Sequence, residues 1–133
     1  MSPEGNEAVV RRFWNELIVG GNVDVAPELL TPDYVNLIVE RIGGDDVSTG
    51  PAGIDPTRNG VEHLMAAIKE WHEVVESASF DVVSLAATDD EVFARFNMTT
   101  NMRDGSTARS RGIGYYHLTD GRIDLNDVLN VAI

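Results

Sequence analysis

The chain has 133 residues, 43% of them hydrophobic, with a net charge of −12 and no cysteine. This length suits one domain with a core of its own, so we expect a single domain over residues 1–133. The missing thiols exclude disulfides and cysteine-bound metals, which favours a reducing compartment. The negative charge, with ten basic residues scattered along the chain, argues against nucleic acids and anionic membranes as partners.

Two helices are predicted near the start of the chain. Ser2 is a typical helix-capping residue, and Pro3 suits a first helical turn. Apolar residues then recur at helical spacing until Gly20 ends the run. A short second helix is predicted over about residues 24–30, with Pro27 in its first turn. The first residues lack the basic segment and apolar run of a signal peptide, and no apolar stretch approaches the roughly 20 residues of a membrane span. We therefore expect a cytoplasmic protein.

The middle of the chain predicts a strand, a loop and a helix. Residues 34–40 are rich in Val, Ile and Tyr, as strands are. Residues 41–60 are rich in glycine and include two prolines, so we expect a long loop that covers the mouth of a pocket. Residues 61–75 carry apolar side chains at helical spacing and predict a third helix.

From residue 80 onward the apolar period changes to that of strands, predicted over 80–87, 92–102, 108–118 and 122–133. The dipeptides Asp104-Gly105 and Asp120-Gly121 are typical of hairpin turns. Consecutive hairpins form an antiparallel meander. The predicted class is therefore α+β, with three helices packed on one face of a curved, mainly antiparallel sheet.

Asp127, on the last predicted strand, is the strongest candidate for catalysis. Because side chains alternate along a strand, it would share a side with Ile123, Leu125 and Leu129. Burial among apolar neighbours raises the pKa of a carboxyl group, which can then act as a general acid or base near neutral pH. The alternative is a solvated aspartate, or one turned outward by a β-bulge that reverses the register.

Two polar pairs lie on other predicted strands. Arg95 and Asn97 share one side, which faces solvent by default; if that side faces inward, the pair could stabilise a substrate oxygen. Tyr34 and Asn36 also point the same way. They could orient a substrate hydroxyl or a water, or they could belong to an ordinary half-exposed strand.

Three further residues are candidates for the wall of a pocket. Phe13 and Trp14 are expected in the core or at the pocket wall, and His72 flanks the apolar face of the third predicted helix. His72 could reach the pocket or could be a surface histidine. The three histidines of the chain lack the spacing of a zinc site, and phosphate-binding, dinucleotide-binding and serine-hydrolase motifs are missing. We therefore expect neither a metal nor a cofactor.

Three stretches of the sequence are similar to a known family. EAVVRRFWNELIVGGNVDVAPELLTPDYVN, STGPAGI and GYYHLTDGRIDLNDVLN resemble the SnoaL-like polyketide cyclases of the nuclear transport factor two-like superfamily. The resemblance implies a cone-shaped fold whose mouth admits an apolar small molecule between the helices and the concave sheet. It further implies ring closure by aldol chemistry without cofactor or metal, with Asp127 as the acid/base and Asn36 in the pocket.

The resemblance also has departures and alternatives. Gly114 stands where these cyclases carry a pocket histidine. The limonene epoxide hydrolases, which share the fold, use a Tyr-x-Asn pair, an Arg-x-Asp pair and a last-strand aspartate; here Asn97 replaces the second acid. A domain that binds a small molecule without catalysis is the other alternative. Family analogy and the apolar residues on both sides of the strands lead us to expect a homodimer.

Overall fold

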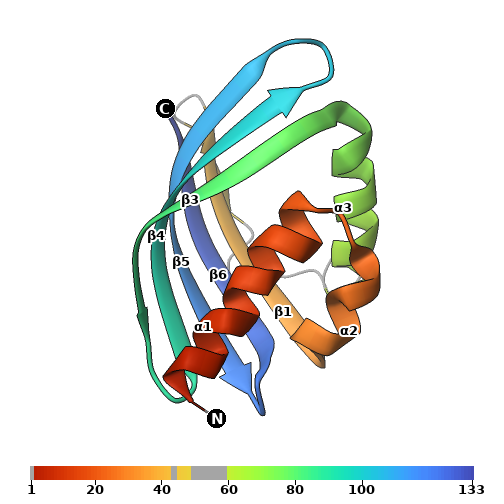
Figure 1. Ribbon diagram of the computed structural model, residues 1–133. Coiled ribbons are helices and arrows are strands. Elements are labelled where there is room, and N and C mark those ends of the chain that lie inside the picture. Colours follow the sequence, from red (N-terminus) through yellow and green to blue (C-terminus); the bar gives the residue numbers. More distant parts are fainter. Residues whose placement is uncertain (1, 43–44, 49–59) are drawn as a thin grey trace.

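The computed structural model describes residues 2–42, 45–48 and 60–133, and its side chains are described for 2–36 and 60–133. Three helices and two short helical turns lie against one curved sheet (Figure 1). The helical elements are α1 (Pro3–Arg12), a π-helix (Phe13–Val19), a 3₁₀ turn (Val23–Val25), α2 (Ala26–Leu29) and α3 (Val61–Val74). The strands are β1 (Leu30–Ile42), β2 (Asp45–Ser48), β3 (Val75–Ala87), β4 (Glu91–Met102), β5 (Thr107–Thr119) and β6 (Arg122–Ala132).

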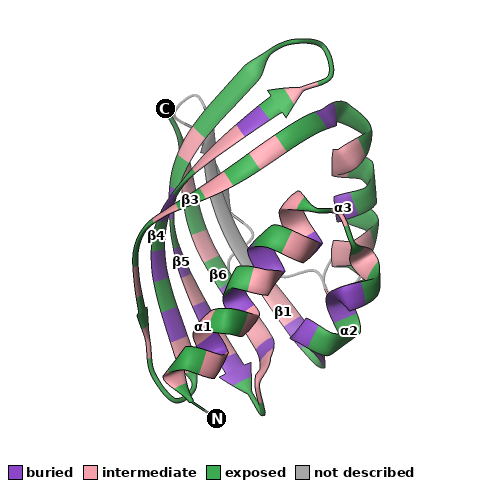
Figure 2. Cartoon of the chain, in the orientation of Figure 1, coloured by how far each residue is buried: buried purple, intermediate pink, exposed green. Residues whose placement is uncertain are grey.

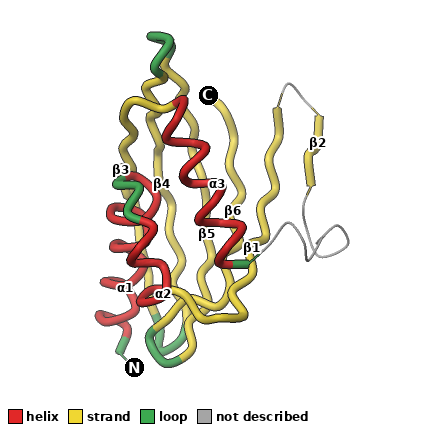
Figure 3. The backbone as a smooth tube through the Cα atoms, turned by 90° about the vertical axis from the view of Figure 1, so that its right-hand side faces the viewer, coloured by secondary structure: helices red, strands yellow, loops and turns green. Residues whose placement is uncertain are grey.

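The strands form a six-stranded sheet in the order β2-β1-β6-β5-β4-β3. Every neighbouring pair is antiparallel except β1 and β6, which run parallel. Figure 3 shows β1 and β2 at one edge of the sheet and all three helices on one side of it. The predicted α+β class and the mainly antiparallel meander are thus confirmed.

The first predicted helix is present, but it changes type along its length. The Ser2 hydroxyl accepts a hydrogen bond from the backbone N–H of Gly5 at 3.0 Å, which confirms the expected cap. After Arg12 the chain continues as a π-helix to Val19. Its wider turn is visible in the bond from the Gly20 N–H to the Asn15 carbonyl at 2.9 Å.

Two predicted boundaries on the following segment are wrong. The second helix is present close to its predicted residues, as a 3₁₀ turn followed by the short α2. The strand β1, however, begins at Leu30, four residues before the predicted start. The predicted loop over 41–60 also holds the end of β1 and all of β2, which pairs with β1 from Val39↔Ser48 to Ile42↔Asp45. The rest of that loop, residues 43–44 and 49–59, lies outside the described residues.

The hairpin turns follow the predicted dipeptides. Asp120 and Gly121 both adopt positive φ angles, 51° and 77°, as the tight two-residue turn between β5 and β6 requires. Gly105 has a φ of 92° in the turn between β4 and β5. Glycine suits positions 105 and 121 because a Cβ atom is disfavoured at positive φ.

The core lies between the helices and the inner, concave face of the sheet (Figure 2). On β4 the buried residues Val92, Ala94 and Phe96 alternate with exposed neighbours, so one face of this strand is buried and the other contacts solvent. Trp14 links the two layers: its ring stacks on Phe80 with centroids 6.0 Å apart. The helical segment that carries Trp14 is therefore anchored directly on the strands.

Candidate functional site

A β-bulge in β6 determines which of its side chains reach the inner face. His117 pairs with Leu125 and Leu118 pairs with Ile123, so Asp124 is the extra residue between two paired positions. Such an insertion reverses the alternation of side chains after it. Ile123 and Asn126 are accordingly both buried, although they are three residues apart.

The prediction that Asp127 lies on an apolar inner face is therefore wrong. Asp127 is exposed, and it pairs across the sheet with Tyr115, while the buried Asn126 pairs with Tyr116. Leu129, on the same side as Asp127, is 49% exposed. The β-bulge alternative describes this strand correctly, and the carboxylate is not held out of water by apolar neighbours.

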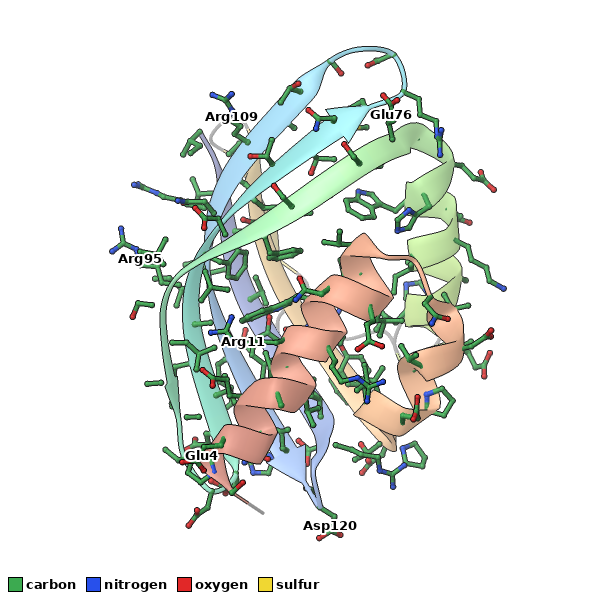
Figure 4. All side chains as sticks on the ribbon, viewed as in Figure 1. Glu4, Arg11, Glu76, Arg95, Arg109 and Asp120 are labelled. Carbon is green, nitrogen blue, oxygen red and sulfur yellow. The ribbon has the colours of Figure 1, made fainter. Side chains whose placement is uncertain are left out.

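Arg95 and Asn97 also lie on the outer face of the sheet. Both are exposed, whereas Ala94 and Phe96 beside them are buried. Figure 4 shows Arg95 pointing away from the helices. The default expectation of solvent contact is confirmed, and an inward role for this pair as a clamp on a substrate oxygen is wrong.

Tyr34 and Asn36 point inward. Of the two alternatives, an inward-facing polar pair or an ordinary half-exposed strand, the first describes the structure. The Tyr34 hydroxyl donates to Asn36 Oδ1 at 3.2 Å and accepts from Asn126 Nδ2 at 3.2 Å. Tyr34 is 1% exposed, and burial raises the pKa of its hydroxyl, so it remains a neutral hydrogen-bonding group at ordinary pH.

Trp14 and Phe13 lie in the core, with 2% exposure each. The Trp14 Nε1–H donates to the Tyr116 hydroxyl at 2.8 Å, and Phe13 meets the same ring edge-on. Burial raises the pKa of Tyr116 as well. Asn36, Asn126 and Tyr116 occupy one row across β1, β6 and β5. We call Tyr34, Asn36, Tyr116 and Asn126 the inner polar group.

His72 supports the fold and does not join the inner polar group. Its Nε2 lies 2.9 Å from the carbonyl oxygen of Ile18, near the end of the π-helix. The last carbonyls of a helix have no partner within the helix, so a side chain commonly satisfies them. A Cβ atom on Gly21 would approach His72 Nε2 to 2.9 Å, which shows how closely the ring packs there.

The inner face around this group is uncharged and mainly apolar. Among the strand residues with described side chains, the inner face carries no acidic or basic group. Away from the buried floor, several inner residues are only half-buried: Leu64 and Met65 on α3, Phe80 on β3, Met98 on β4 and Val128 on β6. These half-buried side chains border the buried core on the inner side of the sheet.

A separate groove of about 470 Å³ lies at the start of α3. It is lined by residues of α2, of β1 and of the start of α3, and by Arg122. No predicted site residue lines it. In the part of the chain that the structure describes, no cluster of three or more His, Asp or Glu residues could hold a metal ion. No described helix is long and apolar enough to cross a membrane.

Sequence reasoning missed Asn126 and Tyr116 as members of the site. Strict alternation from Ile123 places Asn126 on the outside, and only the one-residue bulge at Asp124 brings it in. The available signal was Asp124 itself, a polar residue between two apolar ones directly after a turn. Tyr116 was hidden because Tyr115 beside it is equally aromatic, and only the pairing with β6 shows which of the two faces inward.

The fold is shared with several solved structures of low sequence identity. TsrD from Streptomyces laurentii superposes with a TM-score of 0.73 at 17% identity, covering 98% of this chain and 90% of that one. A putative polyketide cyclase from Bacillus cereus gives 0.71 at 19% identity, covering 95% and 74%. A limonene-epoxide-hydrolase-like enzyme of Mycobacterium tuberculosis gives 0.68 at 14% identity, covering 98% and 84%.

At these identities the likeness is one of fold. No curated protein sequence matches the chain significantly. The sequence pattern of the SnoaL-like domain, however, matches residues 10–125, from α1 into β6. The inner polar group thus lies in a chain that belongs to the SnoaL-like domain family.

Proposed function

We propose that this domain binds a small, apolar molecule with an oxygen-bearing group in its cone, without acid–base catalysis by Asp127. The observation that supports this most directly is the inner polar group itself. It places four neutral hydrogen-bonding side chains close together on an uncharged, mainly apolar inner face. Small-molecule sites typically combine an apolar lining with a few convergent polar groups.

A polyketide cyclase or an epoxide hydrolase remains the nearest catalytic alternative, because solved neighbours carry those descriptions. Both reactions need a titratable group at the reacting atoms. Asp127 and Arg95 are exposed on the outer face, and the described inner face offers tyrosines and asparagines in their place. These observations favour binding over proton transfer.

The proposal can be tested with naphthalene as an apolar probe, measured by equilibrium dialysis. Val128 points into the cone and is half-buried, while the neighbouring Leu129 points outward. Val128→Trp should fill the cone and weaken binding at least tenfold, and Leu129→Trp should leave binding unchanged. Circular dichroism establishes that both variants fold. Equal binding by the two variants, or no binding by the wild type, would contradict the proposal.

We also propose that two copies associate through the outer face of the sheet. That face carries exposed apolar residues, including Phe93, Ile113 and Leu129 at 44%, 62% and 49% exposure. Exposed apolar groups that cluster on one face are typical of interaction surfaces.

A further inference from the structure

Tyr116 places its hydroxyl above the next inward position of its own strand. A Cβ atom on Gly114 would lie 2.9 Å from Cε2 of Tyr116 and 3.1 Å from its hydroxyl oxygen. The side chain therefore runs along β5 over Gly114, which pairs with Val128 of β6. The tyrosine hydroxyl occupies the space that a side chain at position 114 would take.

The proton of this hydroxyl is still available for a hydrogen bond. An indole N–H can only donate, so Tyr116 is the acceptor in its 2.8 Å bond with Trp14. A hydroxyl that accepts one bond becomes a better donor for the next. No acceptor for the Tyr116 proton lies among the residues that the structure describes. Tyr116 is 1% exposed, so water on the surface does not satisfy it.

Asn126, directly across the sheet from Tyr116, has an unused hydrogen-bond acceptor. Its Nδ2 is used in the bond to the Tyr34 hydroxyl, whose own proton goes to Asn36. Because Asn126 is the donor in this bond, its Oδ1 remains buried and without a partner in the described part of the chain. Asn126 is 6% exposed. Buried polar atoms normally have a hydrogen-bond partner, so we expect this acceptor to bind a donor that is not part of the chain.

Tyr116 thus has an unused donor and Asn126 an unused acceptor, on neighbouring strands of the same inner face. Asn130 Oδ1, further along β6 on that face, is also buried without a partner in the described part of the chain. Tyr116 and Asn126 are directly paired, so their Cβ atoms are about 5 Å apart, and the Tyr116 ring extends from there along β5 over Gly114. The two polar atoms are not bonded to each other. A single hydroxyl group between them can accept from Tyr116 and donate to Asn126. A ketone or an ether can only accept, and it leaves Asn126 Oδ1 unpaired.

We propose that Tyr116 and Asn126 form a subsite that recognises a hydroxyl group of the ligand. The ligand class is then an apolar alcohol, phenol or enol, held by two hydrogen bonds of opposite direction. This inference rests on the proposed binding function, and it adds the direction of the hydrogen bonds. Gly114 belongs to the subsite because any larger residue there would displace the Tyr116 ring.

The test uses three probes with one skeleton: naphthalene, 2-methoxynaphthalene and 2-naphthol, measured by equilibrium dialysis. We expect 2-naphthol to bind about tenfold tighter than 2-methoxynaphthalene, the size of one additional hydrogen bond. Asn126→Leu should remove that advantage and leave the other two probes unchanged. Tyr116→Phe should weaken both oxygenated probes and leave naphthalene unchanged.

Tyr115→Phe is the matched control, because Tyr115 is adjacent in sequence but bonds to Glu91 at 2.8 Å on the outer face. It should change none of the affinities. If naphthalene binds and 2-naphthol binds no tighter than 2-methoxynaphthalene, the hydroxyl subsite is wrong and the binding function stands. If none of the three probes binds, the binding function itself is contradicted. If Asn126→Leu does not fold, the affinities of Tyr116→Phe for the three probes still test the subsite.

Discussion

At the scale of single residues, Asp124 contributes most to the shape of the site while lying outside it. As the bulge residue it turns Asn126 inward and Asp127 outward. Its carboxylate is held on the outer face by His117, with Nδ1 2.7 Å from Oδ1, and by the hydroxyl of Thr119 at 2.5 Å. Asp90 lies 3.5 Å from the other ring nitrogen of His117. The bulge is thus fixed by an ion pair that depends on pH.

This pair predicts a pH-dependent contribution to stability. The hydrogen bond to Asp124 raises the pKa of His117 above its ordinary 6.5 in the folded state, and the charge of Asp90 adds to the effect. The contribution is therefore fully present below about pH 6.5 and is lost as the pH rises through the raised pKa. We expect His117→Gln to lower the free energy of unfolding more at pH 5.5 than at pH 8.5.

Urea unfolding at both pH values measures this difference. His63→Gln serves as the control, because His63 is an exposed histidine on α3. An equal loss for His117→Gln at the two pH values would show that the charged form of His117 does not hold the bulge.

At the scale of elements, β6 explains what the sequence could and could not predict. The helices, the meander and the hairpin turns follow from apolar periods and turn dipeptides, because each depends on local sequence. The facing of Asp127 depends on one unpaired residue, which is a property of two strands together. Apolar side chains at Leu125 and Leu129 made the outer face look like the core, so the period alone could not reveal the reversal.

In β1, too, the contacts of the site depend on the pairing of two strands and not on local sequence alone. That Tyr34 and Asn36 share a side follows from their spacing within one strand. The bond of Tyr34 with Asn126 depends on the parallel pairing of β1 with β6, which joins segments about 90 residues apart in sequence. Pairing at this distance leaves no local signal.

Deletion of Asp124 provides a direct test of the bulge. His117↔Leu125 and Leu118↔Ile123 are already the pairs on either side of it, so removing Asp124 joins them without a change of register. We expect the variant to fold with Asn126 still inside. It should lose about 1–2 kcal/mol of unfolding free energy from the missing hydrogen bonds, measured by urea unfolding.

Insertion of one alanine after Asn126 is the opposite perturbation. It would move Asp127 into the inward place of Val128, and burying an unpaired carboxylate is costly. We expect a larger loss of stability than for the deletion. If the deletion variant is the less stable of the two, Asp124 is not a simple bulge residue.

At the scale of the whole molecule, the outer face of the sheet is unusual for a surface in contact with water. Ile113 lies near its centre, paired with Leu129 on one side and with Arg95 on the other. Asp127 lies on the same face, beside Tyr115. A face that offers an arginine and an aspartate around an apolar centre can be complementary to itself about a twofold axis.

The proposed homodimer gives a defined result in size-exclusion chromatography with light scattering. The chain has a mass of 14.5 kDa, and we expect the wild type at about twice that value. Ile113→Asp places a charge at the centre of the apolar face and should yield the monomer mass, because an unpaired charge is costly to bury at an interface. Val74→Asp introduces the same charge at the end of α3, at a residue that is 53% exposed, and should leave the dimer intact. A wild type that elutes with the monomer mass contradicts the dimer. The apolar outer face would then be a surface for a different partner, and Leu129 and Ile113 would be the residues on which to seek it.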